Sequence, residues 1–469
     1  MSNKAENHLR RVKKKIDIKR HMTPTQVILF GFIALILAGM ILLMLPVSSA
    51  DGSFTSPKNA LFTATSATCV TGLVVEDTGT HWSIFGQVVI LCLIQVGGLG
   101  FMTMAVMMSI FIKRQITPRE RLLAAQALGL SGVGGTVRLI RRIIIGTFSI
   151  EAIGAAVLAT QFIPIFGLAK GIYYGIFHAV SFFCNAGFDV LDGTGGYGGD
   201  FSSFTSLSQN YIIGITAMIL IIIGGIGFII WDDTVNFFKE RKRFSPYSKF
   251  VIMLSTGLIF GGTILILVYE WSNPATLGNL SVGDKIFGAL FQSVTTRTAG
   301  VDMINNGAMT ESAKLISMLL MFIGGASGST AGGIKVGTFG VLLFAVLSFS
   351  RGDKEVGVMR RKITGETVSR ALTVVGIDLL AVLAATLVIT GTNPDVRVLD
   401  ALYESFSGIA TVGLSLGITP TLSGASHFAI IILMFFGRVG ILTITYSVLL
   451  RRARKNSCIS YPELNMMIG

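Results

Sequence analysis

The chain has 469 residues, of which 51% are hydrophobic and only 13% are charged, and its net charge is +13. This composition excludes a soluble domain with a polar surface and is typical of a membrane protein with several spanning segments. The four cysteines form no Cys-x-x-Cys pair and the five histidines form no spaced cluster, which argues against a disulfide scaffold or a zinc site.

The first 24 residues form a basic arm, which we expect to be cytoplasmic. About twenty polar residues precede the first apolar run, and no small-residue cleavage site follows it. We therefore expect the first helix to stay in the membrane.

Apolar segments long enough to span a bilayer recur along the chain in pairs. Their centres lie near Leu35, Leu91, Ile153, Leu220, Leu258, Leu319, Leu380 and Ile432. Each pair encloses a shorter, half-apolar segment: "PKNALFTATSAT", "GIYYGIFHAVSFF", "VGDKIFGALFQSV" or "DALYESFSGIA". These segments of roughly a dozen residues are too short to cross, and we expect each to enter the membrane and return.

A glycine follows each short segment at nearly constant spacing. Gly72, Gly187, Gly300 and Gly413 are 115, 113 and 113 residues apart. A second glycine cluster follows in each unit, starting at Gly97, Gly224, Gly324 and Gly437. This fourfold repetition predicts an all-α polytopic membrane protein with four pseudo-symmetric helix–pore loop–helix repeats around one central pore.

The repeats divide the chain into six parts. We expect a basic arm, four repeats and a cytoplasmic C-terminal tail, at residues 1–24, 25–125, 126–243, 244–362, 363–455 and 456–469.

The basic residues indicate the orientation in the membrane. Of the 38 lysines and arginines, 30 lie in the N-terminal arm, the segments that join the repeats, and the C-terminal segment. The positive-inside rule then places both termini in the cytoplasm and the four glycine loops outside. Topology and lipid contact explain the net charge, so we do not expect nucleic-acid binding.

Glycine-broken loops at membrane depth have a physical explanation. Irregular backbone is tolerated there only when it is buried in protein or lines a watery cavity. Four such loops around one axis would present a ring of carbonyl oxygens, which can replace the hydration shell of a potassium ion. Each short helix would also direct its negative C-terminal end at the centre, which favours a cation.

The loops "SATCVTGL", "FFCNAGF", "VTTRTAGV" and "IATVGL", with "GGASGSTAGGIK" and "FFGRVGILT", resemble the Trk/Ktr/HKT superfamily of potassium transporters. The membrane subunit of the bacterial Ktr system is the most similar branch, and the resemblance extends from about Thr23 to Pro462. It implies a potassium-binding selectivity filter made of Cys69, Val70, Thr71, Gly72, Asn185, Ala186, Gly187, Thr298, Ala299, Gly300, Thr411, Val412 and Gly413.

Two positions bear on which ion the filter selects and how it is coordinated. In the plant branch a serine in the first loop is associated with sodium selectivity, whereas this chain has Gly72, which implies potassium. Cys69 stands where the family pattern has threonine, and backbone coordination should survive that change.

The resemblance also implies a gate on the cytoplasmic side of the filter. Its residues would be Gly325, Ala326, Ser327, Gly328, Ser329, Thr330, Ala331, Gly332, Gly333, Lys335 and Arg438. The glycine-rich run superficially fits a phosphate loop, but Ile334 stands where lysine is required, so we expect no nucleotide to bind this chain. The alternative to an intramembrane loop is a glycine-rich helix kink.

The charged residues at membrane depth leave alternatives open. Arg438 occupies the place that glycine holds in the other units, and it forms either part of the barrier or a structural ion pair. Lys335 joins that barrier or extends to the cytosol. For Glu151 and Asp378, the alternatives are pairing with such cations, lining a crevice, and direct ion binding.

Arg297 lies beside the third filter strand. It either repels cations or braces the strand through carbonyls of the neighbouring short helix or a carboxylate such as Glu404. Five acidic residues follow the glycines and would form an outer vestibule that concentrates cations, although charge asymmetry alone also places acidic residues outside. They are Glu76, Asp77, Asp189, Asp192 and Asp302.

No catalytic constellation or nucleotide fingerprint occurs, so we expect a transporter in the bacterial plasma membrane and not an enzyme. The membrane potential would drive potassium uptake, with sodium as a second candidate driving ion. The resemblance implies a homodimer that binds an octameric cytosolic ring of RCK-type subunits, through basic surfaces at residues 241–243 and 360–362. Two alternatives are an alternating-access cation transporter and a non-conducting assembly subunit.

Overall fold

The structure is a computed structural model that describes residues 24–100, 103, 104, 106, 107, 109, 116–127, 134–197, 201–241, 243–353, 355–359 and 361–440. Most of the expected basic arm and the whole expected C-terminal tail lie outside these ranges, as do Lys242 and Arg360 of the two basic surfaces.

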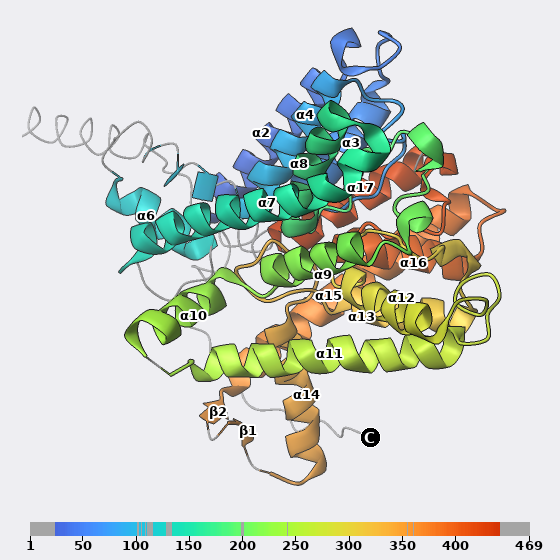
Figure 1. Ribbon diagram of the computed structural model, residues 1–469. Coiled ribbons are helices and arrows are strands. Elements are labelled where there is room, and N and C mark those ends of the chain that lie inside the picture. Colours follow the sequence, from blue (N-terminus) through green and yellow to red (C-terminus); the bar gives the residue numbers. More distant parts are fainter. Residues whose placement is uncertain are drawn as a thin grey trace, which may run out of the picture.

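Twelve of the described helices form four units of three (Figure 1). The first helices are α2 (Pro24–Leu43), α7 (Thr136–Phe166), α11 (Pro246–Glu270) and α15 (Gly365–Thr392). The short helices are α3 (Pro57–Cys69), α8 (Leu168–Cys184), α12 (Val282–Thr295) and α16 (Val398–Ala410). The second helices are α4 (Ile84–Leu99), α9 (Tyr211–Gly225), α13 (Glu311–Phe322) and α17 (Gly424–Val439).

The remaining elements connect or extend these units. They are α6 (Pro118–Ala127), α10 (Phe228–Glu240), α14 (Val336–Ser350), strands β1 (Val356–Val358) and β2 (Arg361–Ile363), and the short turns η1 (Pro46–Ser48), η2 (Thr194–Gly196), η3 (Thr205–Leu207), η4 (Asn306–Ala308) and η5 (Thr419–Thr421). The two strands form one antiparallel hairpin, which lies with α14 at the lower edge of the bundle in Figure 1.

The prediction of an all-helical polytopic protein is confirmed apart from this hairpin. Every predicted apolar centre lies in a helix. The first helices of the four units are long and apolar enough to cross a membrane. Large apolar side chains remain exposed on them, for example Ile41, Leu380 and Leu387, as expected of a surface that faces lipid.

The second helices end at or near their glycine clusters in all four units, whereas the sequence predicts an interruption only in the third. Gly100, Gly227 and Gly440 follow α4, α9 and α17 with positive φ angles of 84°, 99° and 85°, a backbone conformation that glycine adopts without strain. At Gly227 the chain bends by 97° into α10, and α13 gives way to irregular backbone at residues 323–335, which we call the inner loop.

The short helices are the most deeply buried elements. Nine of the thirteen residues of α3 are buried, and α8 contributes Phe177, Phe182 and Phe183 to the largest apolar core cluster. Serine side chains start two of these helices, since Ser56 caps α3 and Ser281 caps α12 through backbone N–H groups. These caps fix where α3 and α12 begin.

Candidate functional site

The four loops that follow the short helices share one backbone conformation. In each loop a left-handed residue is followed two positions later by a glycine with positive φ. The pairs are Val70 and Gly72, Asn185 and Gly187, Thr298 and Gly300, and Thr411 and Gly413. Cys69 is the last residue of α3, as Cys184 is of α8. Cys69 therefore belongs to the short helix, as Cys184 does. The extended segment of the first loop consists of Val70–Gly72, whereas the sequence prediction for this loop also included Cys69.

The four loop glycines form a closed ring, which we call the glycine ring. A Cβ atom on Gly300 would lie 2.1 Å from the carbonyl oxygen of Val412, and one on Gly413 would lie 2.2 Å from that of Thr71. A Cβ on Gly72 would lie 2.6 Å from the Ala186 oxygen and one on Gly187 3.0 Å from the Ala299 oxygen. Each glycine thus contacts the next unit and the last contacts the first, so four extended strands surround one axis.

Hydroxyl side chains in the last turns of the short helices support the strands. The hydroxyl oxygens of Ser66 and Ser407 each accept a hydrogen bond of 3.1 Å from the ring glycines Gly72 and Gly413. Ser181 donates to the carbonyl oxygen of Phe188 at 2.6 Å, and Thr295 both accepts from and donates to the backbone of Val301.

Sequence reasoning missed this supporting role. A detectable signal was present, because a hydroxyl residue occurs six positions before the ring glycine in three units and five before it in the third.

The second helices pack directly on the ends of the short helices. A Cβ on Gly97 or Gly224 would lie 2.0 Å from the carbonyl oxygen of Thr68 or Phe183, and one on Gly437 would lie 1.9 Å from that of Ile409. No larger residue fits this approach, which explains why the clusters of the first, second and fourth units begin with glycine. The C-terminal ends of the short helices, with their partial negative charge, therefore surround the ring.

A cavity of about 260 Å³ lies outside the ring, and we call it the vestibule. All four ring glycines line it, together with Asp77, Asp189 and Asp302. Burial, reinforced by the charge of Asp77, raises the pKa of Asp189 to about 7, and burial raises the pKa of Asp302 well above its usual range. A cation in the vestibule would favour the ionised forms of both groups.

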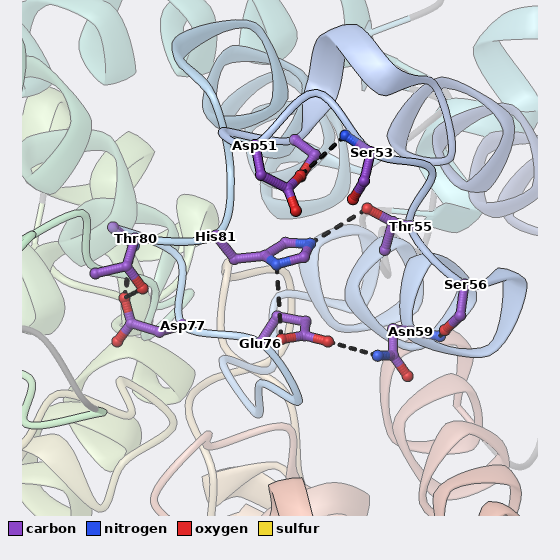
Figure 2. Close-up of polar contacts among 11 residues, drawn as sticks. Asp51, Ser53, Thr55, Ser56, Asn59, Glu76, Asp77, Thr80 and His81 are labelled. Atoms are coloured by element: carbon purple, nitrogen blue, oxygen red, sulfur yellow. Dashed lines mark hydrogen bonds and ion pairs between the residues drawn. The ribbon is translucent and has the colours of Figure 1, made fainter.

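The other two predicted vestibule residues are engaged elsewhere. Figure 2 shows Glu76 accepting a hydrogen bond of 2.6 Å from Asn59 and lying 3.7 Å from the ring nitrogen Nδ1 of His81, whose Nε2 pairs with Thr55. Asp192 forms an ion pair of 2.9 Å with Lys170. Burial alone would raise the pKa of Asp192, but the hydrogen bonds from Thr194 and Lys170 outweigh it and lower the pKa to about 2.

The inner loop joins three units beside the ring. The backbone N–H of Ala326 donates to the carbonyl oxygen of Gly225 at 2.9 Å, and that of Phe228 donates to the Gly328 oxygen at 2.7 Å. On the opposite side, a Cβ on Gly332 would lie 1.8 Å from the Thr411 hydroxyl. The glycine-rich run is thus an ordered loop, so the alternative of a kinked helix is wrong.

Arg438 extends from α17 to both neighbouring units. Its guanidinium donates to the carbonyl oxygen of Thr330 in the inner loop, and to those of Gly97 at 2.5 Å and Gly98 at 2.9 Å on α4. Within the described residues it forms no ion pair, so the alternative of a structural ion pair is not supported there.

Two of the other three intramembrane charges have local partners. Lys335 donates to the carbonyl oxygens of Ala331 at 2.8 Å and Gly332 at 3.3 Å, which closes the inner loop on itself. Glu151 accepts from the amide of Gln95 at 3.1 Å rather than from a cation. For Asp378, no hydrogen bond or ion pair is found within the described part of the chain.

Arg297 does brace the region, but through a partner we did not predict. It donates to the carbonyl oxygen of Gly324 at the start of the inner loop, at 3.0 Å. Glu404 instead accepts hydrogen bonds from Ser415, Leu416 and Thr419, and so holds the loop that follows the fourth strand.

A ring of four backbone strands enclosed by apolar helices defines this chain as a polytopic membrane protein built around one central pathway. The profile of the family described as TrkH, cation transport protein, matches residues 3–457. The chain therefore belongs to the TrkH family of cation transport proteins, and it is a transporter and not an enzyme.

Individual relatives agree with this assignment. The chain is 40% identical over 458 residues to the potassium/sodium uptake protein NtpJ of Enterococcus hirae, covering 97% of this chain and 99% of that protein. It is 40% identical over 451 residues to the Ktr system potassium uptake protein B of Bacillus subtilis, covering 95% and 97%. The structure of the potassium transporter TrkH from Vibrio parahaemolyticus superposes with a TM-score of 0.68 at 20% identity, covering 92% and 86% of the two chains, and supports the fold.

Proposed function

We propose that this chain is the ion-translocating subunit of a bacterial potassium uptake system and conducts potassium through the glycine ring. The single observation that carries the proposal is the closure of the ring, in which each loop glycine contacts the next unit and the last contacts the first. Carbonyl oxygens of residues 70–72, 185–187, 298–300 and 411–413 would replace the hydration shell of the ion. Two relatives are named as potassium uptake proteins, which supports the same ion.

Potassium selectivity would follow from the ring backbone. Gly72 adds no side chain to the axis, and any Cβ there would collide with the backbone of the second unit. The acidic vestibule would concentrate cations at the outer entrance. The membrane potential would drive uptake, and sodium is a second candidate driving ion because one relative is named a potassium/sodium uptake protein.

Residues 325–333, Lys335 and Arg438 would form the gate. The proposal is supported by the contacts of the inner loop with Gly225 and Phe228 on one side and with Arg438 on another. A fixed guanidinium beside the ring would oppose a cation that leaves it, while the loop would block the pathway sterically. Opening then requires the loop to leave Arg438 and the second unit.

The assembly we propose has three parts. Two copies of this chain form a homodimer in the plasma membrane, with both termini in the cytoplasm. An octameric ring of cytosolic RCK-type subunits binds the basic cytoplasmic surfaces and supplies nucleotide regulation. The Ktr system name of one relative supports a multi-subunit assembly.

Potassium uptake in a bacterial strain that lacks its own uptake systems tests the function. Cells that produce this chain with its cytosolic partner should grow at low potassium and accumulate it. Growth equal to that of cells with an empty vector, with the protein present in the membrane, would contradict the proposal.

A further inference from the structure

A second cavity, of about 430 Å³, lies away from the ring at the N-terminal ends of α11 and α15. It is enclosed by these two helices, by α14 and by the β1–β2 hairpin. The volume is in the range of small-molecule sites. We call this space the hairpin cavity.

The lining of the hairpin cavity combines two chemistries. Phe250, Val341, Ile363 and Val374 make most of the wall apolar, whereas the guanidinium groups of Arg361 and Arg370 lie at its rim. Arg370 pairs with Glu366 on the exposed face of α15, and such exposed pairs contribute little. Arg361 has no ion-pair or hydrogen-bond partner within the described ranges, which leaves a net positive rim.

The position of the hairpin cavity indicates where its occupant comes from. Both α11 and α15 are long and apolar enough to cross a membrane, and both start in basic segments of the chain. The cavity therefore opens at the boundary between bilayer and water on the basic side of the protein. Basic pockets between membrane helices at that boundary bind anionic lipid headgroups.

The inner end of the hairpin cavity touches the proposed gate. Ser327 of the inner loop lines the cavity. The ring of Tyr247, also in the lining, packs against a small apolar cluster of Ile230, Val251 and Ala326. The Tyr247 hydroxyl is buried beside Ser327 without a hydrogen bond of normal geometry among the described residues. An occupant of the cavity can therefore contact the inner loop directly at Ser327.

We propose that the hairpin cavity binds an anionic phospholipid, with its phosphate at Arg361 and Arg370 and an acyl chain against the apolar wall, and that the bound lipid holds the inner loop in place. A free phosphate would leave the apolar wall uncovered, so the lipid fits the lining better. The coupling to transport rests on the proposed gating role of the inner loop, whereas the binding does not.

Retention of phosphatidylglycerol by the purified full-length protein tests the binding, with native mass spectrometry to count bound lipids. The parent should retain phosphatidylglycerol in preference to phosphatidylcholine. Arg361→Gln with Arg370→Gln should lower its affinity about 25-fold, from about fivefold per basic residue at a membrane surface. Gly337→Trp should also lower it by filling the cavity, because a Cβ at Gly337 meets no atom within 4 Å.

Lys362→Gln is the matched control, since Lys362 lies on β2 but pairs with Glu355 and does not line the cavity. Equal retention by the parent and the double variant would overturn the proposal. Displacement of the lipid by inorganic phosphate at low concentration would overturn the lipid as the occupant. Loss of dimerisation in Gly337→Trp with unchanged lipid retention would instead assign the cavity to a second copy of the chain.

Rubidium flux into vesicles of phosphatidylcholine with and without phosphatidylglycerol tests the coupling. Flux through the parent should depend on phosphatidylglycerol, and flux through the double variant should not. A double variant that loses the lipid yet keeps that dependence would overturn the coupling. A parent without flux in any vesicle would contradict the proposed function and leave the binding result standing.

Discussion

Gly300 and Gly257 are both glycines in apolar segments, but an added methyl group would meet very different surroundings. At Gly300 a Cβ would lie 2.1 Å from the carbonyl oxygen of Val412, whereas at Gly257 nothing lies within 4 Å. Because backbone cannot move aside as a flexible side chain can, the ring positions tolerate only glycine. The glycines on the lipid-facing helix surface have no such restriction.

The ring glycines should therefore differ in a graded way when they are replaced by alanine. Gly300→Ala and Gly413→Ala should abolish potassium preference over sodium, and Gly187→Ala, whose Cβ would lie 3.0 Å from its neighbour, should weaken it less. Gly72→Ser should also lower the preference for potassium over sodium. The measurement is the permeability ratio of potassium to sodium in reconstituted vesicles.

Gly52→Ala is the control for backbone strain alone, since Gly52 has a φ of 72° but no neighbour within 4 Å. It should cost about 1–2 kcal/mol of stability and leave the permeability ratio unchanged. An unchanged ratio in Gly300→Ala as well would show that the ring glycines only serve packing.

Ser407 tests whether hydroxyl groups support the strands of the glycine ring. Ser407→Ala removes the hydroxyl that accepts from the backbone N–H of Gly413, and a buried unsatisfied donor costs about 1–3 kcal/mol. We expect potassium flux and selectivity to fall. Ser405→Ala is the matched control on the same helix, because Ser405 is equally buried but bonds to Ala401 and Thr386. Equal effects of the two variants on selectivity would refute the supporting role.

Arg438 tests the gate. Arg438→Ala removes a fixed charge and the link to the inner loop, so flux without the cytosolic partner should rise at least about tenfold, which corresponds to about 1.4 kcal/mol of barrier. Arg438→Lys keeps the charge but not the forked donor geometry, and it should keep flux low if charge dominates. Vesicle flux of folded protein decides this, and a flux in Arg438→Ala no higher than in the parent would exclude the gating role.

At the scale of elements, the ends of the second helices determine how the short helices and the inner loop pack together. Gly224, the penultimate residue of α9, lies against the carbonyl oxygen of Phe183, and its own carbonyl accepts from the backbone N–H of Thr330. The same position thus joins a second helix, a short helix and the inner loop. A rigid, unbroken helix would leave the inner loop without these partners.

Gly224→Ala should therefore lower the thermal stability of the purified protein. The added Cβ would lie 2.0 Å from backbone, and overpacking of this kind costs about 1–3 kcal/mol. Gly257→Ala, in the exposed interior of α11, should instead raise stability by about 0.5–1 kcal/mol, because alanine restricts the unfolded chain more than glycine does. A Gly224→Ala protein as stable as the Gly257→Ala protein would contradict this assignment.

The repeating elements could be predicted from the sequence because their signals are local and occur four times. Apolar length distinguished the first helices from the short helices, and the spacing from Gly72 to Gly413 located the ring residues. The helix ends at Gly100 and Gly440 were not predicted, since the apolar pattern continues past these positions and only their positive φ angles mark where the helices end. The partners of Arg297 and Glu76 were also missed, because they depend on how distant loops pack.

At the scale of the whole molecule, the ring is nearly fourfold and its surroundings are not. The four units place equivalent backbone around the axis, but only the fourth has an arginine in its glycine cluster, and within the described ranges only the third has an inner loop. A symmetric ring suits coordination of one ion by equivalent oxygens. If the inner loop is the gate, as we propose, the asymmetric side provides one loop on which regulation can act.

The proposed function requires a cation on the axis of the glycine ring. Anomalous diffraction from crystals of the full-length protein grown in rubidium, a heavier substitute for potassium, would locate that cation. We expect anomalous peaks on the axis enclosed by residues 70–72, 185–187, 298–300 and 411–413. An empty ring with peaks elsewhere, for example between Gln95 and Glu151, would contradict it.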